Sequence, residues 1–337
     1  MTKPPQRMQA ALLRRFDGPL ELGQLRRPTA AAGQALVRVR AVGLCGTDLK
    51  ILAGVMRPDL ALPAVLGHEI AGEVVESTDP SLCAGTRVAC YPYLTCGLCR
   101  PCDRGQQNIC SRARLFGLDE PGGLAEYLAA PVANLLPLSA GTEFAAAAVS
   151  MDAVAVTWHA LVGRGQLTRD ERVVVVGAGG LGLNAVQIAL GRGAEVAVVE
   201  PDAGRRAVAE RLGVKCAVAP DEQAELAGWA DLSLEVSGTR AGFDAAVSTL
   251  GEGGRLICCG YYPGTEFGLD SRELVGREVS VLGSRGSTRS DAAAALAAVE
   301  RGEIRPVIDS VWELARADEA VARLCSGRAL GRVVIAV

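Results

Sequence analysis

The chain has 337 residues, with 35 Lys or Arg against 38 Asp or Glu, so its formal net charge is −3. Acidic and basic residues alternate along it without a block of either sign, which argues against a nucleic-acid or polybasic membrane partner. With 49% hydrophobic residues and 40 glycines, the composition is typical of a well-packed globular protein of about two domains.

The N-terminal stretch 1–16 holds four basic residues but only a short apolar run, 10–13, which is too short for the core of a signal peptide. We therefore expect a cytoplasmic protein. The uncharged stretch 173–191 is long enough to cross a membrane. Four of its glycines cluster between 177 and 182, at a turn, so we expect no membrane span there.

Between residues 34 and 137, short apolar runs are separated by Gly, Pro and Asp, which predicts many short strands in a barrel-like β-rich domain. The clearest runs are 35–42, 70–75, 86–89 and 125–131.

After an Ala-rich predicted helix at 143–162, strands and helices alternate. The predicted strands are 173–176, 195–199, 231–236 and 255–259, and the predicted helices are 181–190, 203–212 and 241–250. This rhythm predicts right-handed βαβ crossovers and a parallel, doubly wound sheet. Two further helices, 290–301 and 317–325, precede a final strand, 332–337.

A G-x-G-x-x-G motif follows the first of these strands and opens a helix. Gly177 allows the tight turn, Gly179 lets the backbone approach a pyrophosphate, and Gly182 permits close packing of helix and strand. Gly180 and Leu181 complete the loop. The motif predicts a dinucleotide site.

Glu200 ends the next predicted strand, eighteen residues beyond the motif. A carboxylate there accepts hydrogen bonds from the adenosine ribose hydroxyls and repels a 2′-phosphate, so the sequence favours NAD over NADP. Arg205 and Arg206 follow closely and could weaken that preference.

Four of the eleven cysteines fall within fifteen residues. They are Cys96, Cys99, Cys102 and Cys110. Four thiolates in one loop can close tetrahedrally on zinc, and a site without an open position is structural. A second, more diffuse set consists of Cys45, His68 and Asp152, which would leave a fourth zinc position open. Spacing alone does not join them.

Five motifs, in this order and at these distances, resemble the zinc-dependent medium-chain dehydrogenase/reductase family, the relatives of alcohol, sorbitol and threonine dehydrogenases. They are 45–48 (CGTD), 67–69 (GHE), the four-cysteine lobe, 122–127 (GGLAEY) and 173–182. The resemblance covers nearly the whole chain. It implies an α/β protein with a GroES-like catalytic domain, 1–150 and 290–337, and a Rossmann NAD-binding domain, 151–289.

The resemblance also implies roles at a catalytic zinc. Cys45 and His68 would be ligands, with Asp152 as the third ligand, as in the bacterial secondary-alcohol dehydrogenases. Glu69 would be a neighbouring carboxylate that can ligate when substrate is absent. Asp48 would contact His68 without binding the zinc itself and would so orient the ring.

Zinc would act as a Lewis acid on the alcohol oxygen, and Thr47 would carry the proton away. Many relatives have a His two residues after the CGTD-like motif, whereas this chain has Lys50, so the relay ends either in Lys50 or in water. Arg332 resembles the family's late basic residue near the cofactor pyrophosphate, with a solvated strand residue as the alternative.

We therefore predict an enzyme, a zinc-dependent oxidoreductase that transfers a hydride between a secondary alcohol or polyol and NAD, with one catalytic and one structural zinc per chain. Two alternatives stay open. One is a zinc-free NAD(P)H-dependent alkene or quinone reductase of the same fold, whose members lack the Cys and His ligands. The other is a zinc-binding redox or cofactor sensor.

The expected partners are a small alcohol or carbonyl substrate and further copies of the chain, in a homodimer or homotetramer, with 278–282 as the candidate sheet edge. The segments expected to line the substrate pocket are 49–60, 91–95, 112–117 and 283–288.

Overall fold

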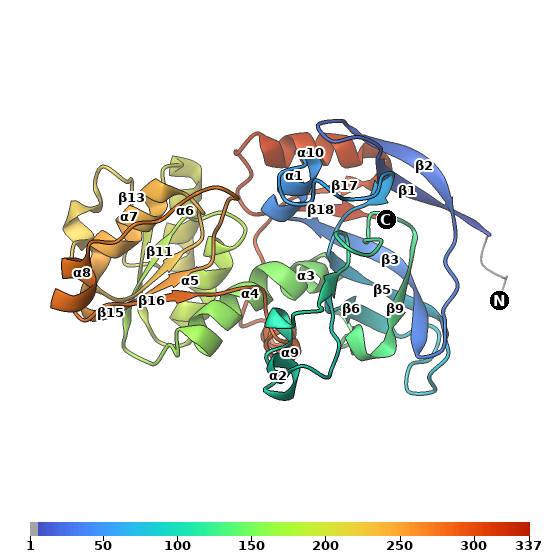
Figure 1. Ribbon diagram of the computed structural model, residues 1–337, viewed down its shortest axis with the longest axis horizontal. Coiled ribbons are helices and arrows are strands. Elements are labelled where there is room, and N and C mark those ends of the chain that lie inside the picture. Colours follow the sequence, from blue (N-terminus) through green and yellow to red (C-terminus); the bar gives the residue numbers. More distant parts are fainter. Residues whose placement is uncertain (1–5) are drawn as a thin grey trace. The chain divides into compact units, whose positions relative to one another are not determined.

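The computed structural model describes residues 6–337. The chain divides into two units: the first runs to Asp152 and resumes at Ile308–Val337, and the second is Ala153–Val307. Figure 1 follows the chain through both.

The boundary on the C-terminal side lies later than the sequence predicts. The segment 290–307, expected in the β-rich domain, belongs to the second unit. There α9 (Arg289–Glu300) packs on α4 (Ala155–Trp158), and His159 Nδ1 lies 2.7 Å from Asp291 Oδ2. An amphipathic pattern shows that a helix has an apolar face but not which surface covers that face.

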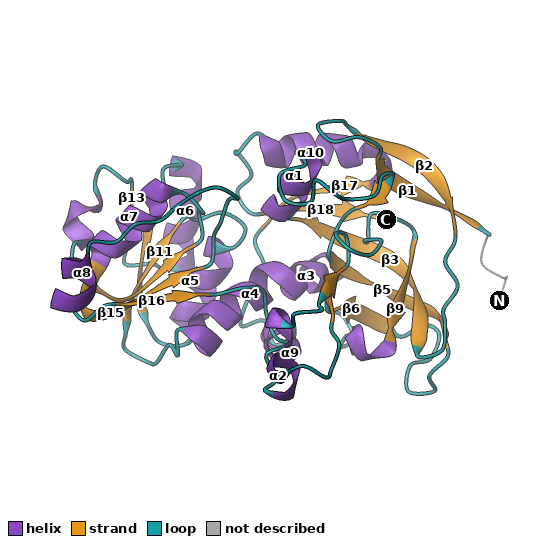
Figure 2. Ribbon diagram, in the orientation of Figure 1, coloured by secondary structure: helices purple, strands orange, loops and turns teal. Residues whose placement is uncertain are grey.

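The first unit consists mainly of strands (Figure 2). They are β1 (Arg7–Leu13), β2 (Leu20–Arg26), β3 (Gln34–Leu44), β4 (Ala64–Val65), β5 (Glu69–Ser77), β6 (Arg87–Cys90), β7 (Tyr93–Leu94), β8 (Arg114–Leu115), β9 (Tyr127–Pro131), β10 (Leu135–Pro137), β17 (Ile308–Glu313) and β18 (Arg332–Ala336). The main sheet has the order β10-β6-β5-β3-β18-β17, and β9 also pairs with β3. A second sheet has the order β2-β1-β4, and β7 pairs with β8.

Short helices complete this unit. They are α1 (Gly46–Leu52), α2 (Arg100–Asp103), α3 (Phe144–Val149) and α10 (Ala317–Cys325). The core under the main sheet is apolar: Leu36 and Val42 of β3, Ile70 of β5 and Val333 of β18 are all fully buried. Charged residues such as Arg38 of β3 and Glu73 of β5 interrupt the apolar runs where side chains are exposed or half-buried.

The second unit is the doubly wound α/β domain that the sequence predicts. Its strands are β11 (Arg172–Val176), β12 (Glu195–Val199), β13 (Cys216–Val218), β14 (Ala230–Glu235), β15 (Leu250–Cys258) and β16 (Ser280–Gly283). Its main helices are α4, α5 (Gly182–Gly191), α6 (Ala203–Leu212), α7 (Arg240–Thr249), α8 (Ser271–Gly276) and α9.

All six strands are parallel, in the order β13-β12-β11-β14-β15-β16. The chain moves outward from β11 to β13, then returns to β14 and moves out the other way. Right-handed crossovers in opposite directions place helices on both faces of the sheet. In such sheets a ligand binds at the carboxyl ends of the strands where the direction reverses, here between β11 and β14.

Among the described residues, one helical stretch, Phe144–Arg164, has the length and apolar composition to cross a membrane. Of its most apolar 18 residues, 72% are buried inside the protein. Such burial is typical of a core helix. The shorter stretch 173–191 forms β11 and α5, with the glycine loop between them, as the sequence predicts.

Candidate metal centre and cofactor site

Strand register brings the candidate catalytic ligands together. In the antiparallel pair β3 and β5, Gly43 lies opposite Glu69, and in the pair β3 and β18, Leu44 lies opposite Val333. Cys45 follows β3 and His68 precedes β5. The sheet therefore places a thiol, an imidazole and a carboxyl group at one end of two neighbouring strands, with Arg332 at the start of the third.

Asp152 comes from a π-helical turn, Ser150–Val154, directly after α3. Helix α3 contacts β3, β5 and β18, so its end lies over the same strand ends. Single π-helical turns inside α-helices occur frequently at functional sites. This turn completes the cluster.

The ligand atoms of Cys45, His68, Glu69 and Asp152 all lie within 4.8 Å of one another. His68 Nε2 is 3.8 Å from Asp152 Oδ2, and His68 Nδ1 is 3.6 Å from Asp48 Oδ1. Asp48 Oδ2 also accepts a 2.8 Å hydrogen bond from the backbone N–H of Cys45. Asp48 thus fixes the backbone of Cys45 and lies beside the ring of His68; that it orients this ring stays a prediction.

Arg332 binds the two acids of this cluster. Its Nε donates to Glu69 Oε1 at 2.8 Å, and its Nη2 donates to the same oxygen and, at 2.7 Å, to Asp152 Oδ2. The residue is only 4% exposed. The expected contact with a cofactor pyrophosphate is therefore corrected: the structure uses this guanidinium to hold the carboxylates, because its position opposite the end of β3 directs it into the cluster.

The charges in the cluster are unbalanced. Burial raises the pKa of Glu69 to about 8, even beside Arg332. Burial acts in the same direction on Asp152, but the hydrogen bond from His68 and the charges of His68 and Arg332 outweigh it, and the net pKa of Asp152 is lowered. One guanidinium faces two carboxyl groups and a thiol.

These residues fit a zinc ion. The buried atom Glu69 Oε2 has no hydrogen-bond partner among the described residues. Unpaired buried polar atoms are rare in folded proteins. Sulfur, nitrogen and oxygen ligands at this separation are those that zinc accepts, and a divalent cation would balance the acidic groups.

The four-cysteine lobe forms a second cluster in the same unit, with ligand atoms also within 4.8 Å of one another. Cys96 lies 3.5 Å from Cys110, and Cys99 lies 3.5 Å from Cys102, measured between sulfur atoms. The pKa of the Cys96 thiol is lowered, mainly by a hydrogen bond from the backbone N–H of Leu98. The arrangement matches a closed four-thiolate zinc site.

The glycine loop of the second unit has the geometry that its sequence predicts. Gly177 has φ of 98°, and a Cβ on Gly182 would lie 1.8 Å from the carbonyl oxygen of Gly177. A Cβ on Gly179 would have only Arg205 Nη1 nearby, at 4.0 Å, so the loop is open above this glycine. Gly180 and Leu181 lead directly into α5, so the N-terminus of this helix lies at the loop.

Glu200 follows β12 and is 2% exposed. Its Oε2 accepts from the N–H of Ala178 at 2.6 Å, and its Oε1 accepts from the N–H of Asp202 at 3.0 Å. Arg205 Nη1 lies 3.7 Å from Oε1. The carboxylate is thereby held beside the glycine loop, with oxygen lone pairs left for ribose hydroxyls.

Comparison with known proteins agrees with this geometry. The alcohol dehydrogenase GroES-like domain matches residues 31–140, and the zinc-binding dehydrogenase domain matches residues 180–301. The chain belongs to the zinc-dependent medium-chain dehydrogenase/reductase family. It is an oxidoreductase of that family, with the α/β architecture of a GroES-like and a Rossmann domain.

Three relatives illustrate the likeness. L-galactonate-5-dehydrogenase of Escherichia coli (strain K12) is 35% identical over 78% of this chain and 79% of its own. An alcohol dehydrogenase of Geobacillus stearothermophilus is 31% identical over 98% of this chain and 100% of its own. The crystal structure of an NAD-dependent alcohol dehydrogenase has a TM-score of 0.92 and 30% identity, over 98% of this chain and 100% of that one.

The two candidate relay residues of this dehydrogenase lie on α1, the helix that follows Cys45. Thr47 and Lys50 are three residues apart, so their side chains share one face of the helix. Lys50 is half-buried, and burial lowers the pKa of its ammonium against the attraction of Cys45 and Asp152. An ammonium with a lowered pKa can exchange a proton more readily near neutral pH.

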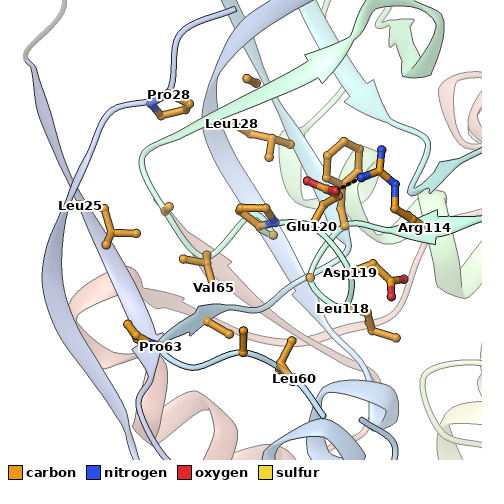
Figure 3. Close-up of a pocket in the computed structure, with 18 of the residues that line it drawn as sticks. Leu25, Pro28, Leu60, Pro63, Val65, Arg114, Leu118, Asp119, Glu120 and Leu128 are labelled. Carbon is orange, nitrogen blue, oxygen red and sulfur yellow. Dashed lines mark hydrogen bonds and ion pairs between the residues drawn. The ribbon is translucent and has the colours of Figure 1, made fainter.

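A cavity of 740 Å³ lies elsewhere in the first unit (Figure 3). Two of the four segments expected to line the substrate pocket contribute to it, 49–60 through Arg57 and Leu60, and 112–117 through Arg114 and Phe116. None of the candidate zinc ligands lines it. Figure 3 shows apolar side chains around it and the Arg114–Glu120 ion pair beside them.

Sequence analysis missed one residue that shapes the catalytic cluster. A Cβ on Gly43 would lie 1.9 Å from Glu69 Oε2, so only glycine leaves room for this carboxylate. The local signal was weak, because Gly43 lies inside an apolar run that reads as a strand. Gly43 matters because the register of β3 with β5 places it opposite Glu69.

Proposed function

We propose that the protein is an NAD-linked dehydrogenase that oxidises a secondary alcohol or polyol to the carbonyl compound, with one catalytic and one structural zinc per chain. The observation that carries this proposal is the convergence of Cys45, His68, Glu69 and Asp152 from three segments within 4.8 Å. Cys45, His68 and Asp152 would hold the catalytic zinc, and Glu69 would be an alternative ligand. The lobe cysteines Cys96, Cys99, Cys102 and Cys110 would hold the structural zinc.

Zinc, when bound, supplies a Lewis acid that lowers the pKa of a substrate hydroxyl. The protein's own residues do the rest. Asp48 keeps the His68 ring in place, and Arg332 holds Glu69 and Asp152. Thr47 Oγ1 would take up the proton of the substrate hydroxyl while its own hydroxyl proton passes to Lys50, on the same helix face. Lys50 would accept it as the neutral amine and release it to water.

The glycine loop and Glu200 support NAD as the hydride acceptor. Glu200 presents a buried, oriented carboxylate where the adenosine ribose would lie. Arg205 Nη1 lies 3.7 Å from Glu200 Oε1, so its charge is already paired with this carboxylate and is less available to a 2′-phosphate. The NAD-dependent alcohol dehydrogenase similar in structure agrees with this assignment.

The similarity to the Escherichia coli relative favours a polyol or a sugar acid as the substrate. L-galactonate, named as the substrate of the Escherichia coli relative, carries several hydroxyl groups and a carboxylate. The ammonium of Lys50 lies close enough to Cys45 and Asp152 for their charges to act on its pKa. A basic side chain therefore lies beside the cluster. We propose that the substrate is a small molecule of this class.

For the assembly, we propose a homodimer formed through β16. This strand ends the second unit's sheet, and Val281 on it is 40% exposed. On α8, Leu274 is 43% and Val275 is 73% exposed. Open strand edges with apolar side chains favour pairing with another copy.

The eleven free cysteines suit a reducing, cytoplasmic environment.

The test of this function measures NADH formation when the zinc-loaded protein is given NAD and a panel of secondary alcohols, polyols and sugar acids. We expect turnover with NAD to exceed turnover with NADP. His68→Ala should abolish turnover, and His159→Gln, which changes the other histidine of the chain, should retain it. Reduction of alkenes or quinones by both variants alike, without alcohol oxidation, would contradict the proposal.

A further inference from the structure

The turn that follows β14, residues 236–239, lies where the second half of a dinucleotide must bind. Glu200 marks the adenosine side at the end of β12, and the glycine loop after β11 takes the pyrophosphate. Because β14 is the neighbour of β11 on the opposite side, the nicotinamide of an extended cofactor lies over the ends of β14 and β15.

A buried carboxylate organises this turn. Glu235, the last residue of β14, is fully buried. Its Oε1 accepts three hydrogen bonds: from Ser237 N–H at 2.7 Å, from Ser237 Oγ at 2.5 Å and from Gly238 N–H at 2.8 Å. The Ser237 hydroxyl also lies 2.9 Å from Thr239 Oγ1. One oxygen atom therefore fixes the backbone and the first hydroxyl of the turn.

The backbone of Glu235 joins this turn to the next loop. Its carbonyl oxygen accepts from the N–H groups of Cys259 and Gly260, at 2.9 and 3.0 Å. A Cβ on Gly260 would lie 2.3 Å from Gly238 N, and a Cβ on Gly238 would lie 2.7 Å from Tyr261 N. The two loops thus pack backbone against backbone, without side chains between them, so the position of one restricts the position of the other.

The arrangement is costly for the fold alone. Glu235 Oε2 has no hydrogen-bond partner among the described residues, and burial raises the pKa of this carboxyl. An unsatisfied buried polar atom destabilises a protein by about 1–3 kcal/mol. The hydrogen bonds to Oε1 offset this cost, and all three come from the turn, so what the carboxylate stabilises is the conformation of the turn.

We propose that Glu235 is a positioning residue for the nicotinamide half of the cofactor: it sets the 236–239 turn against the Gly260–Tyr261 loop and so shapes the surface on which the nicotinamide ring rests. The proposal rests on the dinucleotide site of the proposed function but not on the zinc chemistry. It assigns Glu235 no contact with the cofactor.

The test compares the affinities of purified, zinc-loaded variants for NADH and for ADP-ribose, measured by calorimetry. ADP-ribose has every part of the cofactor except the nicotinamide ring. We expect Glu235→Ala to weaken NADH binding about tenfold or more, since small displacements at a binding surface have large effects. ADP-ribose affinity should change by less than about twofold, because Glu200 and the glycine loop are untouched.

Two more variants separate positioning from general stability. Glu235→Gln keeps an oxygen that can accept the three hydrogen bonds, so it should restore most of the NADH affinity. Ser237→Ala removes one of the three bonds and should weaken NADH binding about threefold. This variant keeps the test decisive if Glu235→Ala does not fold. The fluorescence of bound NADH should shift in Glu235→Ala and not in Glu235→Gln.

Asp231→Asn is the matched control. Asp231 lies near the other end of the same strand, where its carboxylate accepts from the N–H of Arg172 at 2.8 Å. Its change should leave both affinities as in the wild type.

Equal losses of both ligands in Glu235→Ala, or no loss of either, would overturn the proposal. So would wild-type protein that binds NADH no more tightly than ADP-ribose. If the wild type binds NADH more tightly but oxidises no alcohol, the proposed function fails and the role of Glu235 stands.

Discussion

The two candidate metal sites of the first unit are assembled in opposite ways. The four thiols of the lobe come from one loop, 96–110, whose local backbone sets their positions. The candidate catalytic ligands follow β3, precede or begin β5, and come from the π-helical turn after α3. Neighbouring residues suffice for the four-cysteine cluster, whereas the cluster of Cys45, His68, Glu69 and Asp152 depends on the register of the sheet.

The largest effect should come from Cys45→Ala. We expect the zinc content to fall from two to one per chain and kcat/KM for alcohol oxidation to fall about a thousandfold, which corresponds to a loss of about 4 kcal/mol of transition-state stabilisation. Elemental analysis and steady-state kinetics measure the two. Cys90→Ala is the control, because burial raises the pKa of that thiol to about 12 and it lies in neither cluster. If Cys45→Ala kept two zinc ions per chain, Cys45 would not be needed to bind zinc, and the proposed difference between the two sites would be wrong.

Cys96→Ala should affect stability and not chemistry. Without the fourth thiolate the lobe would lose its zinc, and we expect the free energy of unfolding to fall by about 4 kcal/mol. The remaining folded protein should retain its kcat. Denaturant unfolding, with activity normalised to folded protein, measures this. A fall in kcat as large as that of Cys45→Ala, at unchanged stability, would contradict the structural role of the lobe.

Asp48→Asn should weaken only the catalytic site. The amide cannot attract the His68 ring as the carboxylate does, so zinc affinity at this site should fall about 10- to 100-fold while the lobe keeps its metal. Competition with a chelator resolves the two classes of zinc. Asp103→Asn is the control, since that exposed residue of α2 lies beside the lobe. Equal weakening of both classes would refute the assignment.

Gly43→Ala should have the smallest effect. The added methyl group would meet Glu69 Oε2, and we expect the free energy of unfolding to fall by about 2 kcal/mol as the carboxylate shifts. The zinc of the lobe should not change. Gly191→Ala is the control, because a Cβ there meets nothing within 4 Å. Thermal unfolding of both variants, with and without zinc, makes the comparison.

Much of the second unit could be predicted from the sequence. The predicted segments match β11, α5, β12, α6, β14, α7 and the C-terminal part of β15, because each is strongly patterned and bounded by Gly, Pro or Asp. The short strand β13 was not predicted. The glycine loop and Glu200 were found for the same reason. Glu235 was not singled out, because a carboxylate at the end of an apolar strand has no local signature of its role.

The first unit was harder to predict. Strands β1, β2 and β17 were not among the predicted ones. Strands β2 and β17 lie at sheet edges with mostly exposed or half-buried residues, so they lack a clear apolar run. The side chain of Arg332 was expected at a pyrophosphate and is instead buried on Glu69 and Asp152. Its place follows from the pairing of β18 with β3, which joins residues nearly 300 apart in sequence.

The sequence by itself determined the features that depend on short-range chemistry: the cysteine lobe, the turn at Gly177, the doubly wound order and, through five motifs in register, the family. The tertiary structure alone decided that Cys45, His68, Glu69 and Asp152 meet, that Arg332 holds two of them, and that Glu235 holds the turn beside β15. The physical reason is that strand register and helix packing are set by the burial of whole faces. No short segment carries that information.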